Sequence, residues 1–562
     1  MTKIKKSTFI SISSVFIIIA VNLFLIQNLN TNKKATIFTL FLIIFTISTW
    51  KLFKPTNISF HESSKNYTII TFFILLPVVL ITQNFDLNFE QITWDTASYL
   101  VASQEIGLGF IPFETSWESK GPLLFYIYYF LNLLTFKSYV FFRIVNDLII
   151  LLISLMIFKI SFLKTKKYIL SFSSALLYTI LVSKEWYVSE FSEIYCILIL
   201  SIAIYYKEKN NFNSVKLIGF LLSLNSLINQ GSILFIIPFL IWIFSNDFSQ
   251  KKYRNTINFF IFLALPQVFV ITIYGLKNML DLYFANYVTI PISYSGDSLS
   301  SIYELRVWMR EFYNFNFIIY AALSLMLLSF FFGNILNLKY ISKNFFVHGL
   351  VMSLIYYFAG SHNFYHHLFY FLFFVCFFLV TEGGGLYKYI ASLLIILGSC
   401  VTFVNFYEKS FNNLSNYETI QSNYPLYQLS KEIDSYFTND QYTILAIDYV
   451  LVLHYLQKQN YAYIVHPTNH FEDYIENTLI RLGYIEKNNI SVLIDQEPDV
   501  ILCNDTLIIR GVVQNIVDFN CNINEYKNNY LKLDTEIYNN NPNRDRYFDP
   551  TKNMNVFIKI SE

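Results

Sequence analysis

Residues 92–130 read ITWDTASYLVASQEIGLGFIPFETSWESKGPLLFYIYYF, and they follow a long apolar segment of the chain. Five charged side chains lie within this stretch, namely Asp95, Glu105, Glu114, Glu118 and Lys120. Charges are costly at membrane depth, so acidic residues that cluster between apolar segments mark a wet, functional surface. The stretch therefore predicts a functional loop between membrane-spanning helices.

The composition of the whole chain agrees with a membrane protein. The chain has 562 residues, of which 54% are hydrophobic and 14% are charged, and its mean hydropathy is +0.43. A soluble domain of this size does not need so much apolar surface, so the sequence predicts a polytopic α-helical membrane protein. The net charge is +1, so the chain has no excess of positive charge that would indicate a nucleic-acid partner.

Apolar segments long enough to cross a bilayer recur through residues 1–405, which we expect to form the membrane module. We expect about thirteen transmembrane helices, the first of which is retained because it lacks a small-residue cleavage site. The expected spans are 7–27, 35–53, 67–83, 139–161, 168–183, 190–206, 214–229, 231–246, 256–275, 314–333, 343–361, 364–380 and 386–405.

The apolar segment 121–136 decides the topology. With the N-terminus inside, three spans place Asp95 outside, and the positive-inside rule then shows whether 121–136 crosses. If it does not cross, the following basic loops remain inside; if it crosses, they all move outside. These loops contain Lys164, Lys166, Lys167, Lys207, Lys209, Lys251, Lys252, Arg254, Lys339 and Lys343. We therefore expect 121–136 to be an interfacial helix within a catalytic outer loop at about 84–138.

The composition changes after the last expected span, where the chain becomes polar and rich in Asn, Asp and Tyr. Segments 442–448, 461–465 and 498–503 read as strands, with helix-like stretches among them. We therefore expect residues 406–562 to form a small α/β domain on the extracytoplasmic side. No glycine-rich phosphate loop is present, so a nucleotide-binding domain is not indicated.

Three residues near the outer loop have side chains suited to group transfer. The carboxylate of Asp95 can orient or deprotonate a hydroxyl group, or it can simply cap a helix. The ammonium of Lys120, just before Gly121, can hold a lipid phosphate, or it can be an ordinary interfacial lysine. The guanidinium of Arg143, at the outer end of the next span, can grip a phosphate with two donors, or it can be ion-paired.

Other polar residues on the expected outer side are candidates for a sugar or acceptor pocket. Glu190 and Glu193 are one helical turn apart at the start of a span and would share a face, with Glu193 the preferred residue. Residues 229–231, Asn-Gln-Gly, could bond a sugar or form only a tight turn. The expected outer loop 276–313 contains the charged residues Glu304, Arg306 and Arg310. They could form a site for an anion, or they could simply be charges exposed to solvent.

No metal and no cofactor are expected from the sequence. The histidines of residues 361–367, SHNFYHH, have neither the HExxH spacing nor the cysteine partners of a zinc site. An Asp/Asn ladder for calcium is also missing. Cys503 and Cys521 either form a disulfide in an extracytoplasmic domain or are unrelated thiols.

The outer loop resembles the first extracytoplasmic loop of polyprenyl-phosphate-sugar glycosyltransferases with the GT-C fold, including the protein O-mannosyltransferase and lipid A aminoarabinose transferase relatives. The resemblance rests on Trp94-Asp95, on Gly107 and Gly109, and on Lys120-Gly-Pro before an aromatic helix. It extends over about residues 60–400. One departure is Thr96 after the aspartate, where the mannosyltransferases have Asp-Glu, so broader bacterial relatives fit better.

The resemblance implies the GT-C fold in a bacterial inner membrane, with the N-terminus cytoplasmic. In these families the lysine stands in a Lys-Pro-Pro-Leu or Lys-Gly-Pro-Leu motif, and an arginine in the position of Arg143 lies near the carrier phosphate. An acidic residue is expected near Glu190 and Glu193. His366 would take the polar position of a His-Tyr or Arg-Tyr turn.

The resemblance implies a glycosyltransferase that moves a sugar from a polyprenyl-phosphate donor to a glycan, lipid or protein acceptor on the outer face. Membrane lipid is the other expected partner. Two alternatives remain open: a lipid-linked polysaccharide polymerase or ligase, and a membrane transporter or flippase. A transporter more often shows broken helices in two matching halves, and no such symmetry is evident.

Overall fold

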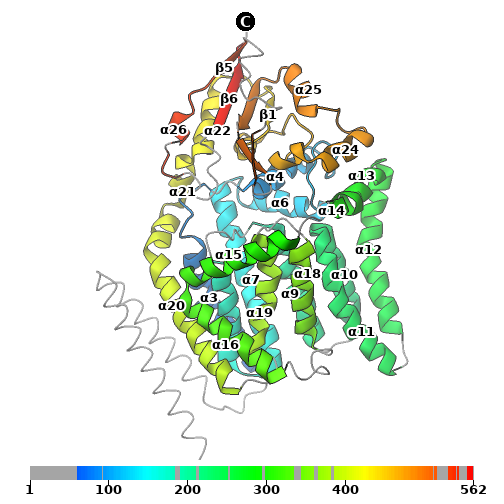
Figure 1. The fold of residues 1–562 in the computed structure, drawn as a ribbon, viewed down its shortest axis with the longest axis vertical. Coiled ribbons are helices and arrows are strands. Elements are labelled where there is room, and N and C mark those ends of the chain that lie inside the picture. Colours follow the sequence, from blue (N-terminus) through cyan, green and yellow to red (C-terminus); the bar gives the residue numbers. More distant parts are fainter. Residues whose placement is uncertain are drawn as a thin grey trace, which may run out of the picture.

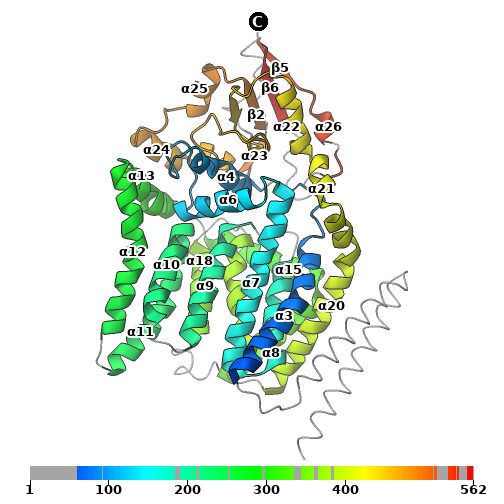
Figure 2. The same ribbon diagram turned by 180° about the vertical axis from the view of Figure 1, so that it is seen from behind.

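The computed structural model contains a bundle of long helices and, over one end of it, a smaller domain with a β-sheet (Figures 1 and 2). It describes residues 60–90, 93–183, 190–209, 214–250, 253–293, 298–334, 344–359, 365–380, 385–504, 506–509, 512–515, 529–539, 541–543 and 554–560. The expected spans 7–27 and 35–53 lie outside these residues.

The bundle consists of apolar helices packed side by side. Its helices are α3 (Phe60–Gln83), α7 (Tyr139–Thr165), α8 (Tyr168–Leu181), α9 (Ser192–Glu208), α10 (Val215–Ile228), α11 (Ile236–Gln250), α12 (Arg254–Leu276), α16 (Phe317–Asn334), α18 (Phe345–Ala359), α19 (Phe369–Val375) and α20 (Gly385–Ser415). Within the described residues, five segments are long and apolar enough to cross a membrane: Asn66–Gln83, Tyr139–Thr165, Gln230–Phe248, Arg254–Leu276 and Tyr387–Ser415. The chain is therefore a largely helical protein whose helices could span a membrane. The count of thirteen spans stays a prediction.

Helix α6 (Pro122–Leu134) does not run with the bundle. It lies across the ends of the bundle helices, between them and the smaller domain (Figures 1 and 2). Its 13 residues reach about 20 Å, which is shorter than a hydrocarbon core of about 30 Å. This orientation agrees with an interfacial helix, whereas the side of the membrane on which it lies stays a prediction.

Short helices before and after α6 form the rest of this layer. They are α4 (Trp94–Ala102), α5 (Gln104–Gly107), α13 (Leu280–Phe284), η3 (Ala285–Thr289) and α14 (Ile290–Ser293), whereas the longer α15 (Ser298–Phe315) packs against α16 and α18. The buried carboxylate of Glu105 organises the loop after α5, because it accepts hydrogen bonds from the backbone N–H groups of Phe113, Thr115 and Ser116 at 2.9–3.2 Å. Glu105 is therefore a structural residue of the loop.

The C-terminal domain contains a four-stranded sheet in the order β1-β2-β6-β5. Strands β1 (Ile444–Ala446) and β2 (Val500–Asn504) are parallel, and β6 (Met554–Lys559) runs antiparallel to β2 and to β5 (Tyr530–Lys532). A separate hairpin joins β3 (Thr506–Ile509) to β4 (Val512–Asn515). The helices are α21 (Tyr417–Ile420), α22 (Pro425–Ser435), α23 (Leu451–Leu456), α24 (Asp473–Arg481), α25 (Asn489–Asp495) and α26 (Glu536–Asn539).

Two of the three predicted strands in this domain are confirmed. Segments 442–448 and 498–503 contain β1 and β2, but the strand at 461–465 is wrong. Instead, Ile464 forms an isolated bridge with Trp117 of the loop before α6. The expected boundary at residue 405 falls inside α20, which continues into the C-terminal domain. Cys503 is disulfide-bonded, and its candidate partner lies outside the described residues.

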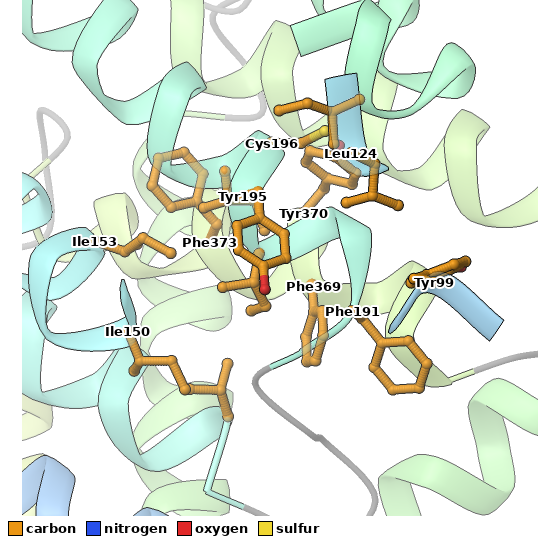
Figure 3. Packing of buried hydrophobic residues seen from close by; sticks show 14 of the residues in the cluster. Tyr99, Leu124, Ile150, Ile153, Phe191, Tyr195, Cys196, Phe369, Tyr370 and Phe373 are labelled. Carbon is orange, nitrogen blue, oxygen red and sulfur yellow. The ribbon is translucent and has the colours of Figure 1, made fainter. Parts of the chain in front are cut away.

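One hydrophobic core runs through the bundle and the layer above it. Figure 3 shows part of it, where Phe191 and Phe369 lie next to each other with their ring centroids 6.4 Å apart. Tyr99 of α4 packs edge-on against Tyr128 of α6 at 5.4 Å and is itself 1% exposed. Helix α4, which carries Asp95, is therefore fixed on a rigid scaffold.

Candidate functional site

Asp95 lies in the first turn of α4, and its carboxylate is oriented by the same helix. The hydroxyl of Tyr99, one turn later, donates a hydrogen bond to Asp95 Oδ1 at 2.7 Å. Thr93, not Asp95, occupies the N-cap position, so the helix-cap alternative does not hold. Burial would raise the pKa of Asp95, but His466, Lys120, His366 and the Tyr99 hydroxyl together lower it below its usual value. The carboxylate is therefore ionised at neutral pH.

Lys120 is near enough to Asp95 for their charges to interact, and the turn that carries it packs tightly against α10. Gly121 N donates to the Ile228 carbonyl at 3.1 Å, and a Cβ on this glycine would be 2.1 Å from the Leu227 oxygen. Burial alone would lower the pKa of Lys120, but three nearby carboxylates raise it above its usual value. These carboxylates belong to Glu193, Asp95 and Glu118. Among the described residues, Lys120 has no ion pair within 4.0 Å, so its ammonium is available to an anion.

Glu118 is a third member of this cluster, and no role was predicted for it from the sequence. Its carboxylate is 1% exposed and accepts hydrogen bonds from the Ser119 hydroxyl and the Lys120 backbone N–H, both at 3.1 Å. Burial raises the pKa of Glu118 to about 7, with Lys120 lowering and Asp95 raising it. This residue therefore changes charge near neutral pH.

Glu193 and Glu190 do not share a helical face as expected, because α9 begins at Ser192 and Glu190 precedes it. Glu193 Oε1 accepts hydrogen bonds from the Tyr356 hydroxyl at 2.8 Å and from Asn229 Nδ2 at 3.1 Å. It is the glutamate whose charge acts on Lys120. The structure thus brings Glu193 to the cluster and places Glu190 elsewhere.

Arg143 lies in a different network from Lys120. Its guanidinium donates to the Phe89 carbonyl at 2.8 Å and to the Tyr424 hydroxyl at 3.2 Å. It also pairs with Asp86 at 3.5 Å and with Glu190 at 3.8 Å. These protein partners, one of which belongs to the C-terminal domain, favour an anchoring role over the phosphate contact predicted from the sequence.

Replacing Arg143 by Ala should destabilise the protein by about 3–5 kcal/mol, because the buried carboxylates of Asp86 and Glu190 would lose their cation. The measurement is the thermal unfolding midpoint of the detergent-solubilised protein, with the exposed Arg254→Ala at the start of α12 as the control. An Arg143→Ala protein that unfolds like the wild type but binds its donor poorly would restore the phosphate role.

The C-terminal domain adds His466 to the cluster, and no sequence pattern had pointed to this residue. Burial lowers the pKa of His466 to about 4, although the charge of Asp95 raises it, so the ring is neutral at pH 7. His466 Nδ1 is 3.0 Å from the Thr468 hydroxyl. Trp94, next to the catalytic candidate, donates from Nε1 to Asp448 Oδ1 of the same domain at 2.9 Å. The domain therefore forms one wall of the site.

The remaining predicted site residues are His366, Arg306 and Glu304. His366 is buried, stacks on Phe191 with ring centroids 4.3 Å apart, and interacts electrostatically with Asp95. Arg306 lies exposed on α15, and no contact reported for the described residues links it to the cluster. The side chain of Glu304 lies outside the described residues.

The arrangement combines an ionised carboxylate, a cation without an ion pair among the described residues, and a neutral histidine in one partly buried place. Such a set can accept a proton at Asp95 while Lys120 binds an anionic group. The chain matches no family model, no curated protein and no solved structure. A proposal for its function therefore depends on this geometry.

Proposed function

We propose that the protein is an integral-membrane glycosyltransferase of the GT-C kind, which takes a sugar from a polyprenyl-phosphate donor. The single observation that carries the proposal is the placement of Asp95 and Lys120 between the helical bundle and the C-terminal domain, near enough for the charge of each residue to act on the other. A site at the end of apolar helices suits a donor whose chain stays in lipid while its head group is exposed.

In the proposed reaction, Asp95 accepts the proton of an acceptor hydroxyl as its oxygen attacks the anomeric carbon of the sugar. The bond between that carbon and the phosphate oxygen breaks, and the electron pair leaves with the lipid phosphate. Lys120 stabilises the negative charge that develops on this leaving group. A single displacement of this kind inverts the configuration at the anomeric carbon.

The charges of the two residues support their assigned roles. Asp95 must be ionised to accept a proton, and its pKa is lowered. Lys120 must be protonated to bind a phosphate, and its pKa is raised. Low local dielectric strengthens both interactions.

The proposal is tested by incubating the purified protein with a panel of radiolabelled polyprenyl-phosphate sugars and an envelope extract as acceptor. Release of polyprenyl phosphate together with labelled product is the expected result. A flippase would move the intact lipid across a vesicle bilayer without releasing it, and that outcome would overturn the proposal.

Donor use should also depend on pH through Glu118. As the pH rises through about 7, this carboxylate ionises beside Lys120 and repels the donor phosphate, so the donor KM should rise by at least about fivefold, or about 1 kcal/mol. Glu118→Gln should flatten this part of the profile. Glu114→Gln, in the same loop but paired with Lys277, is the matched control. An unchanged inflection in Glu118→Gln would assign the titration to another group.

A further inference from the structure

We propose that Glu193, His366 and His367 form a binding site for a divalent metal ion of the zinc type. One ligand atom from each of the three side chains lies within 4.8 Å of the others, and all three residues are buried. Among the carboxylate, imidazole and thiol side chains of the described residues, these three have ligand atoms close enough together to share one metal ion. The site was not expected from the sequence.

The donor set fits zinc better than calcium or magnesium. Two imidazole nitrogens with one carboxylate oxygen are common ligands of zinc, whereas the harder cations prefer oxygen atoms throughout. Ligand atoms around tetrahedral zinc are about 3.4 Å apart. The ligand atoms, which lie within 4.8 Å of one another, would therefore need to close by up to about 1.4 Å when the ion binds. Three protein ligands leave the fourth position open to a water molecule or an anion.

The residues around the three ligands hold them in place, as a metal site requires. Tyr356 and Asn229 donate hydrogen bonds to Glu193 Oε1, and Ser192 Oγ donates to Oε2 at 3.1 Å. The ring of Tyr356 also meets that of His367 edge-on at 5.5 Å. The ligands come from α9 and from η4 (Tyr365–Leu368), which pack into one core with α18.

The site borders the cluster of Asp95 and Lys120. Glu193 interacts electrostatically with Lys120, and His366 interacts with Asp95. A bound cation and the lysine ammonium would repel each other unless an anion lay between them. A phosphate oxygen is the group that suits both, so the metal would add a second positive contact for a phosphate-bearing ligand.

Metal binding can be measured without any transferase assay, and so its failure is distinct from failure of the proposed function. The purified full-length protein is stripped with a chelator, incubated with zinc sulfate, freed of excess metal and analysed by mass spectrometry of the elements. About one zinc per chain is expected for the wild type. Glu193→Gln and His367→Gln should each lower this by at least about tenfold, whereas His348→Gln on α18 should retain it.

Cobalt substitution of the wild-type protein gives a second measurement that does not depend on variants folding. Tetrahedral Co²⁺ with nitrogen and oxygen ligands should give a visible absorption band that added zinc abolishes. Zinc should also raise the unfolding temperature of the wild type and of His348→Gln. A wild-type protein that binds no zinc and shows no cobalt band would overturn the proposal, as would full zinc binding in folded Glu193→Gln and His367→Gln proteins.

Discussion

Replacing Asp95 by Asn is expected to lower the rate of sugar transfer by at least about a hundredfold while the protein remains folded, because a positioned general base contributes 10²–10⁴-fold. The amide keeps the shape of the side chain and can still contact the Tyr99 hydroxyl, but it cannot accept the proton of the acceptor. The measurement is single-turnover release of polyprenyl phosphate, together with the thermal unfolding midpoint.

The matched control is Asp440→Asn, the same substitution at an exposed position of the C-terminal domain. Its activity and unfolding midpoint should equal those of the wild type. If Asp95→Asn retained more than about a tenth of the activity, the lost transition-state stabilisation would be under about 1.4 kcal/mol. Asp95 would then be a residue that orients the acceptor at most.

Local sequence patterns predicted the parts of the structure that depend on local chemistry. The strands at 442–448 and 498–503 are short apolar runs, and their burial in a sheet follows from that pattern. The segment 461–465 has the same pattern, yet it extends along Trp117 of the loop instead of joining the sheet. Whether an apolar segment pairs with a sheet or with a loop depends on tertiary packing, so it cannot be predicted from the sequence of the segment alone.

The acidic residues of the loop that contains Asp95 and Lys120 show a second limit of sequence reasoning. Glu105 is held by backbone N–H groups, and Glu114 pairs with Lys277 at the surface at 2.9 Å, whereas Asp95 and Glu118 lie with Lys120. All four carboxylates look alike in the sequence. Their roles differ because of burial and of the partners that the fold supplies, which are distant in the chain.

Residues contributed from distant segments could not be predicted for the same reason. His466 reaches Asp95 because the C-terminal domain covers α4, and Glu193 reaches His366 and His367 because α9 packs beside η4. For Arg143 the sequence left two roles open, since its position near the end of an expected span was compatible with both a phosphate and an ion pair. In the structure Arg143 pairs with Asp86 and Glu190, so the ion pair is present, and the phosphate contact stays a prediction.

Lys120→Gln is expected to lower kcat/KM for the lipid-linked donor by about 10²–10³-fold, because a contact to the charge developing on the leaving group contributes about 2.7–4 kcal/mol. The acceptor KM should change little, and the unfolding midpoint should fall less than in Arg143→Ala, because this ammonium has no ion pair within 4.0 Å among the described residues. Lys277→Gln, which removes a lysine from a surface pair with Glu114, should keep full activity.

The sequence predicted the same role, binding of the donor phosphate, for Lys120 and Arg143, and the two variants are expected to separate them. Loss of Lys120 should appear in donor kinetics and loss of Arg143 in stability, because Lys120 has no such ion pair and Arg143 is held by protein groups. Lys120→Arg should recover only part of the activity, since a planar guanidinium does not replace a compact ammonium in a turn fixed by Gly121. If Lys120→Gln raised the acceptor KM and left donor use intact, the lysine would belong to the acceptor half of the site, and another group would have to stabilise the leaving phosphate.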